Sequence, residues 1–278
     1  MFYLKLFKTL NDYNNNKNNL LLPNISVVTD VNVIFRKKYE LPYLTITALE
    51  DGLTVSFTTS CQYSLNGTDW NGLPANTITP AINTGEKIYF KAMSVPNGNQ
   101  FTVSKHFNLS GNCMSMIFGD EAQGETDLIG CDNAFSMLFA FTPVVNVSPN
   151  FLPAITLVDN CYDGMFQGCT SLVTAPELPS TTLPYYCYAY MFEGCTSLVN
   201  APELPATTLV DSCYQSMFEG CTSLNYIKML ATDISADYCL YYWVNDVSPT
   251  GTFVKSKDAT WNVTGNNGIP KGWTLETA

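Results

Sequence analysis

Cysteine is the residue type in this sequence whose spacing could most readily do chemistry. Three pairs with a C-x7-C spacing follow one another along the chain: Cys161 with Cys169, Cys187 with Cys195, and Cys213 with Cys221. Zinc sites use shorter spacings and often add histidine, whereas this chain of 278 residues contains a single histidine. We therefore predict no metal and no cofactor, and interpret the cysteines as buried, reduced side chains that pack as small hydrophobes. A redox or metal-binding role is the alternative.

Two carboxylates and the single histidine are the other candidates. Glu177 and Glu203 occupy the same position in consecutive copies of a repeated phrase, so they would lie one copy apart on a surface. There they could bind a cation or a sugar hydroxyl, or simply form part of a solvated face. His106 lies in SKHFNL, a predicted strand, and we interpret it as a strand residue. Because no P-loop, GxSxG or GxGxxG motif is present, we predict no catalytic residue and no enzyme.

A repeat of fixed period must position these residues. Cys161, Cys187, Cys213 and Cys239 are each 26 residues apart, and each begins a related phrase, such as CYAYMFEGCTSLVNAPELPATTLVDS. A degenerate copy precedes the regular ones, and another begins at Cys239 and is abandoned. Regular copies between degenerate ends are typical of a solenoid with capping repeats.

The repeat predicts its own secondary structure. Apolar residues at i, i+4 and i+8 predict a short helix over Leu209–Cys221, with Gly220 near its C-terminal cap. Ser197–Ala201 fits a short strand, which Pro202 and Pro205 end because proline lacks an N–H donor. Stacked copies would form ladders of identical side chains: Leu172, Leu198 and Leu224; Phe166, Phe192 and Phe218; Met165, Met191 and Met217.

The phrase MFxGCTSL followed by a proline-bounded turn resembles the BspA-type leucine-rich repeat, common in proteins of gut Bacteroidales and their phages. The resemblance covers roughly residues 137–245. It implies a curved or slightly twisted solenoid of short strands and helices that is used for adhesion, and it implies no catalysis. The ending NGIPKGWTL resembles the segments that follow such repeats in the same proteins.

The first 43 residues differ from the rest in composition. The run NDYNNNKNN is polar and of low complexity, which predicts an extended tether, and the segment ends near Arg36, Lys37 and Lys38. Residues 1–43 carry a net charge of +3, which leaves −14 for the remainder of a chain whose net charge is −11. We predict that this arm docks on an acidic surface through Arg36, Lys37 and Lys38; a solvated linker is the alternative. Its phrase LPNIS resembles the anchor segment of Bacteroides-phage virion proteins.

Residues 44–110 predict a small β-sandwich-like domain. Strands are expected in LTITAL, LTVSFTT, CQYSL, KIYFKAM and FTVSKHFNL, separated by turn residues. The phrase YSLNGTDW resembles an Asp-box hairpin, with Asn66 where that family has aspartate. The predicted fold is thus mainly β with short helices. It consists of an N-terminal extended arm (1–43), the β-sandwich-like domain (44–110), leucine-rich repeats with a capping lead-in (111–245) and a C-terminal cap (246–278).

Composition excludes several classes of protein. Hydrophobic residues at 46% argue against a disordered chain, and the negative charge disfavours nucleic acid as a partner. No apolar run approaches the ~20 residues of a membrane span. Met1–Leu10 lacks an uninterrupted apolar stretch and a small-residue cleavage site, which favours a protein that is not exported.

These features and the resemblance together predict a non-enzymatic virion structural protein of a Bacteroides (crAss-like) phage. The expected form is a head fibre that decorates the capsid, made in the host cytoplasm and anchored by its arm. Its expected partners are capsid or auxiliary capsid proteins, sister subunits in a trimer by analogy with other phage fibres, and a host surface glycan or protein. A tail fibre and a bacterial surface leucine-rich-repeat adhesin are the alternatives.

Overall fold

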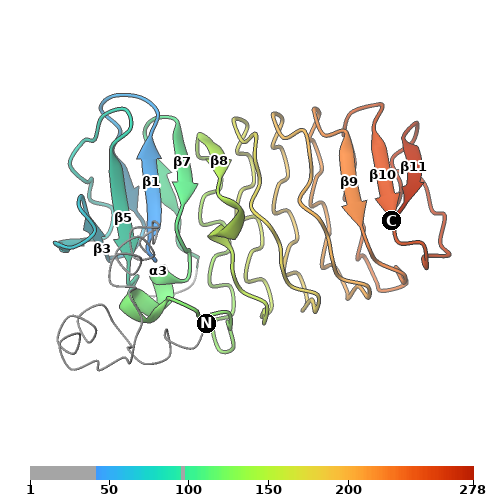
Figure 1. Ribbon diagram of the computed structural model, residues 1–278, viewed down its shortest axis with the longest axis horizontal. Helices are drawn as coiled ribbons and strands as arrows, with labels where there is room; N and C mark the ends of the chain where they lie inside the picture. The colour runs from blue at the N-terminus through green and yellow to red at the C-terminus, as the bar shows by residue number, and fades with distance from the viewer. Residues whose placement is uncertain (1–41, 95–97) are drawn as a thin grey trace, which may run out of the picture. The chain divides into compact units, whose positions relative to one another are not determined.

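The computed structural model describes residues 42–94 and 98–278. The described residues are mainly β, with several sheets and one short α-helix, α3 (Ser115–Phe118) (Figure 1). Two short 3-10 helices, η2 (Gly119–Glu121) and η3 (Pro149–Phe151), accompany them. None of the described helices is long and apolar enough to cross a bilayer. The predicted anchor residues Arg36, Lys37 and Lys38 lie outside the described residues.

The N-terminal part of the described chain is built on a six-stranded sheet with the order β4-β3-β5-β1-β7-β8. Its strands are β1 (Leu44–Ala48), β3 (Cys61–Ser64), β4 (Asn71–Leu73), β5 (Lys87–Lys91), β7 (Phe107–Ser110) and β8 (Val144–Val147). A separate pair, β2 (Val55–Phe57) and β6 (Phe101–Val103), is antiparallel. The five predicted strand regions all contain strands, but β4 was not predicted, because its sequence NGL carries no strand pattern.

One prediction in this region is wrong. FTVSKHFNL was expected to be a single strand with His106 inside it, whereas the structure divides it into β6 and β7, which belong to different sheets. His106 lies in the connection directly before β7. The physical reason is packing: Phe101 of β6 packs against both Phe57 and Phe90, at ring-centroid distances of 4.4 and 5.1 Å, while β7 pairs with β1.

The β3–β4 hairpin contains the phrase that resembles an Asp box. The side chain of Asn66 pins the turn, because its Oδ1 accepts the backbone N–H groups of Thr68 at 2.9 Å and Asp69 at 2.8 Å. The Trp70 ring that follows lies under the ammonium of Lys91, 4.2 Å from the ring centroid. An amide oxygen therefore fills the position of the expected carboxylate oxygen.

The repeats lie side by side and are joined by backbone hydrogen bonds (Figure 1). We call one copy of the 26-residue phrase a rung. In the third rung, the N–H groups of Tyr214, Ser216 and Phe218 donate to carbonyls 25 residues later, at 2.8–3.1 Å. The N–H groups of Gln215 and Met217 between them donate three residues back along their own rung, at 3.2 Å. Alternate N–H groups thus connect neighbouring rungs or close tight turns.

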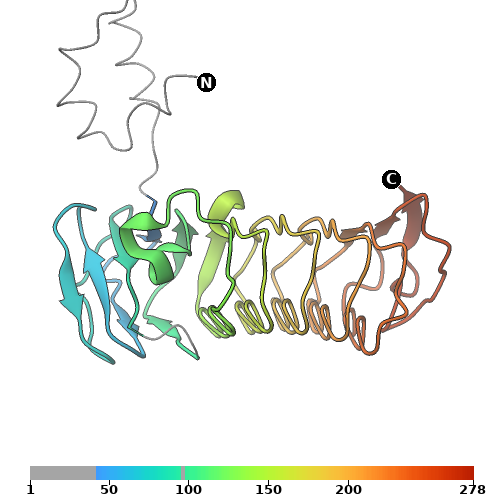
Figure 2. The same ribbon diagram turned by 90° about the horizontal axis from the view of Figure 1, so that it is seen from below.

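This pattern shows that the helix predicted over Leu209–Cys221 is wrong. The segment is a row of tight turns with a four-residue period, visible as the compact coils along one side of the repeats in Figure 2. Ser212, Ser216 and Gly220 have positive φ angles of 57°, 49° and 72°. A left-handed residue at every fourth position interrupts an α-helix, yet preserves the i, i+4 spacing of apolar residues on which the prediction rested.

The strand predicted over Ser197–Ala201 is also wrong. The second rung contains only isolated bridges: Asn200 to Tyr226, Leu204 to Met229 and Thr208 to Asp233. The third rung has no proline at the corresponding positions, and there strand β9 (Tyr226–Met229) forms. It pairs in parallel with β10 (Thr252–Lys255), which pairs with β11 (Thr274–Thr277). Pro202 and Pro205 account for the difference, since each removes a ladder donor.

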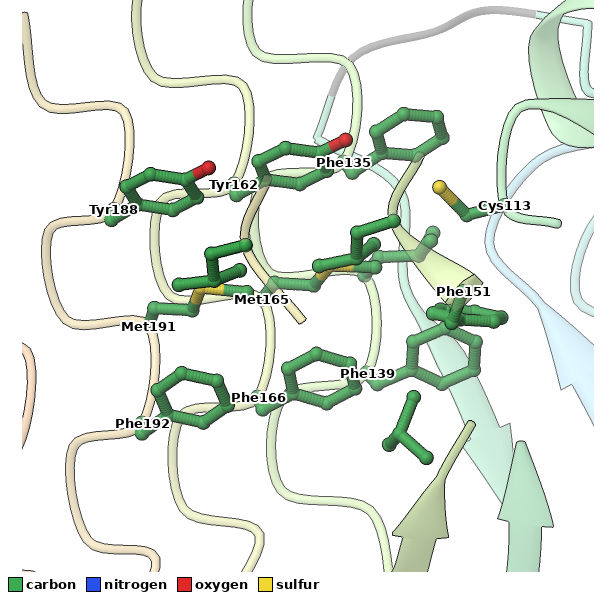
Figure 3. Close-up of a cluster of buried hydrophobic side chains, with 14 of the residues drawn as sticks. Cys113, Phe135, Phe139, Phe151, Tyr162, Met165, Phe166, Tyr188, Met191 and Phe192 are labelled. Atoms are coloured by element: carbon green, nitrogen blue, oxygen red, sulfur yellow. The ribbon is translucent and has the colours of Figure 1, made fainter. Parts of the chain in front are cut away.

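The interior of the repeats confirms the predicted ladders (Figure 3). Stacked rings run through the core, with Phe166 and Phe192 at 5.8 Å and Phe192 and Phe218 at 5.8 Å, nearly parallel in both pairs. All members of the predicted leucine, phenylalanine and methionine ladders are completely buried. The burial of the repeat cysteines is confirmed as well, and all of them are free thiols.

Candidate ligand-binding surface on the turn ladder

The four-residue turns sort side chains between the core and the surface. Along residues 185–194, Cys187, Tyr188, Met191 and Phe192 point inward and are buried, whereas Tyr186 and Tyr190 are partly exposed. We call the outward side of residues 159–168, 185–194, 211–220 and 237–246 the turn face. Each of these four segments therefore presents its outward side chains to solvent at equivalent positions.

Tyrosines gather at two places on the turn face. We call them the tyrosine clusters; their members are Tyr185, Tyr186 and Tyr190, around the start of the second rung, and Tyr238, Tyr241 and Tyr242, around the start of the abandoned copy at Cys239. These residues were not predicted as a site from the sequence. The runs YYCYAY and DYCLYY were visible, but a helical interpretation of the segment distributes the tyrosines around an axis instead of on one side.

The first tyrosine cluster is tied together by hydrogen bonds. The hydroxyl of Tyr186 donates to Oε1 of Gln215 at 3.1 Å, and Nε2 of Gln215 donates to the hydroxyl of Tyr190. The rings of Tyr185 and Tyr186 lie 4.5 Å apart. The hydroxyls of Tyr186 and Tyr190 therefore already have hydrogen-bond partners within the protein.

The second tyrosine cluster is more open. Tyr238 is 65% exposed and Tyr241 is 41% exposed, and their rings meet edge to face at 5.5 Å. Beside them lies a shallow hollow of about 290 Å³, whose lining includes Asn267. Oδ1 of Asn267 accepts the backbone N–H of Tyr242 at 2.8 Å, which orients the amide. The arrangement combines exposed aromatic rings with an oriented amide donor.

The surroundings of the tyrosine clusters are acidic. Between Gly111 and Asp246 the sequence contains one basic residue, Lys228, and its Nζ is paired with Oε2 of Glu203 at 2.9 Å. Two of the acids have a structural role, since Oδ1 of Asp159 and of Asp211 each accept a backbone N–H of the next rung at 3.1 Å. The turn face consequently carries negative charge without a basic partner among its own residues.

The predicted pair Glu177 and Glu203 does not form a metal centre. Both side chains are exposed, and Glu203 is engaged with Lys228. Within residues 42–94 and 98–278, no three histidine, cysteine or acidic side chains come together as a potential metal site. A surface-binding role of Glu177 and Glu203 stays a prediction.

His106 makes contacts that the sequence did not suggest. Its Nδ1 contacts Oε1 of Glu50, and its Nε2 lies 3.2 Å from the hydroxyl of Ser171. This is the order of contacts in a nucleophile–base–acid set. However, the side chains of His106 and Glu50 are about half exposed, whereas catalytic sets of this kind act in water-excluded sites. Ser171 also belongs to the repeated phrase CTSL. We interpret the contacts as a surface link between the β strands and the repeats.

The buried cysteines are unsuited to thiolate chemistry. Burial raises the pKa of Cys161 to about 12 and that of Cys169 to about 11, so these thiols stay protonated at neutral pH. Three of them instead donate to carbonyls of the preceding rung: Cys169 to Phe139 at 3.1 Å, Cys195 to Phe166 at 3.2 Å, and Cys221 to Phe192 at 3.0 Å. These thiols therefore serve as small buried hydrogen-bond donors.

No family model, curated protein or solved structure matches this chain.

Proposed function

We propose that this chain is a non-enzymatic virion structural protein, a capsid-decorating head fibre anchored by its N-terminal arm, whose repeats present an adhesive surface to the host. The observation that carries the proposal is the turn face. It is a repetitive surface with clustered, exposed tyrosines, held by a core of stacked rings. Tyrosine is enriched in binding surfaces because it offers large contact area with few rotatable bonds.

The repeats are, on this proposal, a BspA-type leucine-rich-repeat solenoid, and the strands that precede them a β-sandwich-like domain. Backbone hydrogen bonds that join residues 25 positions apart in neighbouring rungs support the first assignment. Packing of the β2–β6 pair against the six-stranded sheet through Phe101 supports the second. A rigid scaffold of this kind suits adhesion, since each contact is displayed at a fixed spacing.

The arm is the proposed anchor. Its net charge of +3 is opposite to that of the body, and Arg36, Lys37 and Lys38 would meet an acidic surface of capsid or auxiliary capsid proteins. Sister subunits, in a trimer, would be joined near the same end. The proposed location is the capsid surface after synthesis in the host cytoplasm.

A tail fibre and a bacterial surface adhesin remain the alternative functions, because both would use the same turn face. They differ from a head fibre in where the protein is found. A tail fibre would be present on particles near the tail, whereas a surface adhesin would be absent from particles and accessible on intact cells.

Analysis of purified particles tests the proposal. We expect mass spectrometry to detect this chain in particles, and immunogold labelling to place it on the capsid. Deletion of residues 1–43 should leave a soluble protein that no longer enters particles. Charge reversal at Arg36, Lys37 and Lys38 should weaken incorporation, and salt should weaken that of the natural protein by screening.

Two outcomes would contradict the proposal in different ways. If the chain were absent from particles and exposed on cells, it would be an adhesin. If the truncated protein decorated particles at normal occupancy, the arm would not be the anchor.

A further inference from the structure

The second tyrosine cluster is not explained by folding alone. Tyr238 and Tyr242 have positive φ angles of 55° and 53°, a conformation that is strained for a bulky side chain. The first regular rung has Gly164 and the third has Ser216 at the position where the other copies have Tyr190 and Tyr242. Because glycine adopts this conformation without strain, the backbone does not require tyrosine there. Tyr238, which is 65% exposed, also buries little apolar surface.

The hollow beside these rings has the elements of a small binding site. It is lined by the apolar residues Ile234, Ala236 and Leu240, together with Tyr238, Cys239, Tyr241 and Asn267. Binding sites commonly join such a surface to a few oriented polar groups. Here the lining residues with polar side-chain groups include Tyr238, Tyr241 and Asn267, and Oδ1 of Asn267 already accepts the N–H of Tyr242. Nδ2 of Asn267 makes no hydrogen bond within the described part of the chain, so it can donate to a ligand.

The charges around the hollow indicate which sign of charge its ligand can carry. Burial chiefly, and to a smaller extent the charges of the nearby Asp233 and Asp211, raises the pKa of Cys239, a lining residue, to about 11. None of the residues that line the hollow is basic. Anionic sugars, phosphates and nucleic acids would therefore be repelled.

A cationic ligand fits less well than a neutral one. The free group of Asn267 is the donor Nδ2, whose N–H groups carry partial positive charge and would repel a cation. Sugar hydroxyls both donate and accept, so they match the amide donor and the tyrosine hydroxyls. The apolar C–H faces of a pyranose match the aromatic rings and the apolar residues that line the hollow.

We propose that the hollow formed by Tyr238, Tyr241 and Asn267 binds a neutral sugar residue of a host surface glycan. The proposal rests on the proposed adhesive function and assigns it to one site. Contact through ring faces and neutral hydrogen bonds predicts binding that changes little between low and moderate salt.

Binding of the purified full chain to immobilised neutral polysaccharides tests this. The probes are dextran, mannan, galactan and xylan, with heparin as the anionic and polylysine as the cationic comparison. We expect binding to at least one neutral polysaccharide and none to heparin. Tyr241→Ala and Asn267→Ala should each weaken the binding by about tenfold, as expected for the central residues of a binding site.

Two variants separate binding from folding. Tyr241→Phe keeps the ring and should retain most of the affinity. Phe141→Ala removes an exposed ring that lies outside both tyrosine clusters and should leave binding unchanged. Thermal unfolding of every variant is measured, and because Tyr241 is exposed, we expect the melting temperature of Tyr241→Ala to stay close to that of the natural chain.

Several results would overturn the site. These are failure of the natural chain to bind any neutral polysaccharide, salt-sensitive binding to polylysine alone, or a loss in Phe141→Ala equal to that in Tyr241→Ala. None of them decides whether the chain belongs to particles, so the proposed virion function stands or falls separately.

Discussion

At the scale of single residues, the turns bury some polar atoms that have no hydrogen-bond partner among the described residues. Asp163 lies on the turn face between rungs, and its Oδ1 makes no hydrogen bond among the described residues. Burial raises the pKa of its carboxyl group from 3.8 to about 6, although a hydrogen bond from Ser136 opposes the shift. The folded protein therefore holds this proton more tightly than the unfolded chain, and the folded state loses stability as the pH rises from about 4 through 6.

Replacement of this carboxyl by an amide should remove that loss. We expect Asp163→Asn to be more stable than the natural chain by about 1 kcal/mol at pH 7.5, a value reduced for solvent screening of a partly exposed group. Near pH 4 the difference should disappear. Urea unfolding at both pH values measures it, with Asp258→Asn, an exposed acid, as the control. A gain that is equal at both pH values would show that Asp163 is not the titrating group.

At the scale of elements, the rung is the unit that stabilises the repeats. A single rung has no helix and no internal sheet, and its outward N–H groups are satisfied by the neighbouring rung. Its inward side chains are covered by the rungs on both sides, as the ring stacks of Tyr162, Tyr188 and Tyr214 show, at 5.8 and 6.1 Å. Removal of side-chain volume in the middle of this stack should therefore be costly.

Leu198→Ala tests the packing of the middle rung. Leu198 is fully buried, so we expect the free energy of unfolding to fall by about 2–5 kcal/mol. The neighbouring Val199 is 38% exposed, and Val199→Ala should change stability by no more than about 0.5 kcal/mol. Denaturant titration of both variants gives the comparison. Similar small losses at both positions would contradict the assignment of Leu198 to the core.

At the scale of the whole described body, the β strands and the repeats share one core. Strand β7 pairs in parallel with β8, which lies within the degenerate copy that precedes the regular rungs. Phe101 of β6 stacks on Phe139 at 5.0 Å, and its backbone N–H donates to the carbonyl of Leu138 at 2.8 Å. The described residues accordingly belong to one compact unit, and a change at the junction should be felt on both sides.

Phe139→Ala should destabilise both parts together, by about 3–5 kcal/mol. We expect faster amide hydrogen exchange in β6 and in residues 161–169 alike, measured by mass spectrometry. Phe141→Ala, which removes a ring that is 67% exposed, should affect neither region strongly. If exchange rose only in the repeats, the two parts would unfold independently.

The sequence by itself determined the period, the ladders and the burial of the cysteines. A 26-residue repeat with identical apolar residues requires that its copies be stacked in register, because a single copy cannot cover its own Leu198 or Phe192. The strands of residues 44–110 were predictable for a similarly local reason: alternating apolar residues mark a half-buried strand.

Only the tertiary structure decided how each rung is folded. The i, i+4 spacing of Cys213 and Met217 fits both an α-helix and a four-residue turn, and the choice depends on whether alternate N–H groups find a carbonyl on the next rung. That choice also placed Tyr238 and Tyr241 beside Asn267, which is far from both in sequence. The candidate site could not be predicted, since the hydrogen bonds that create its surface join residues about 25 positions apart.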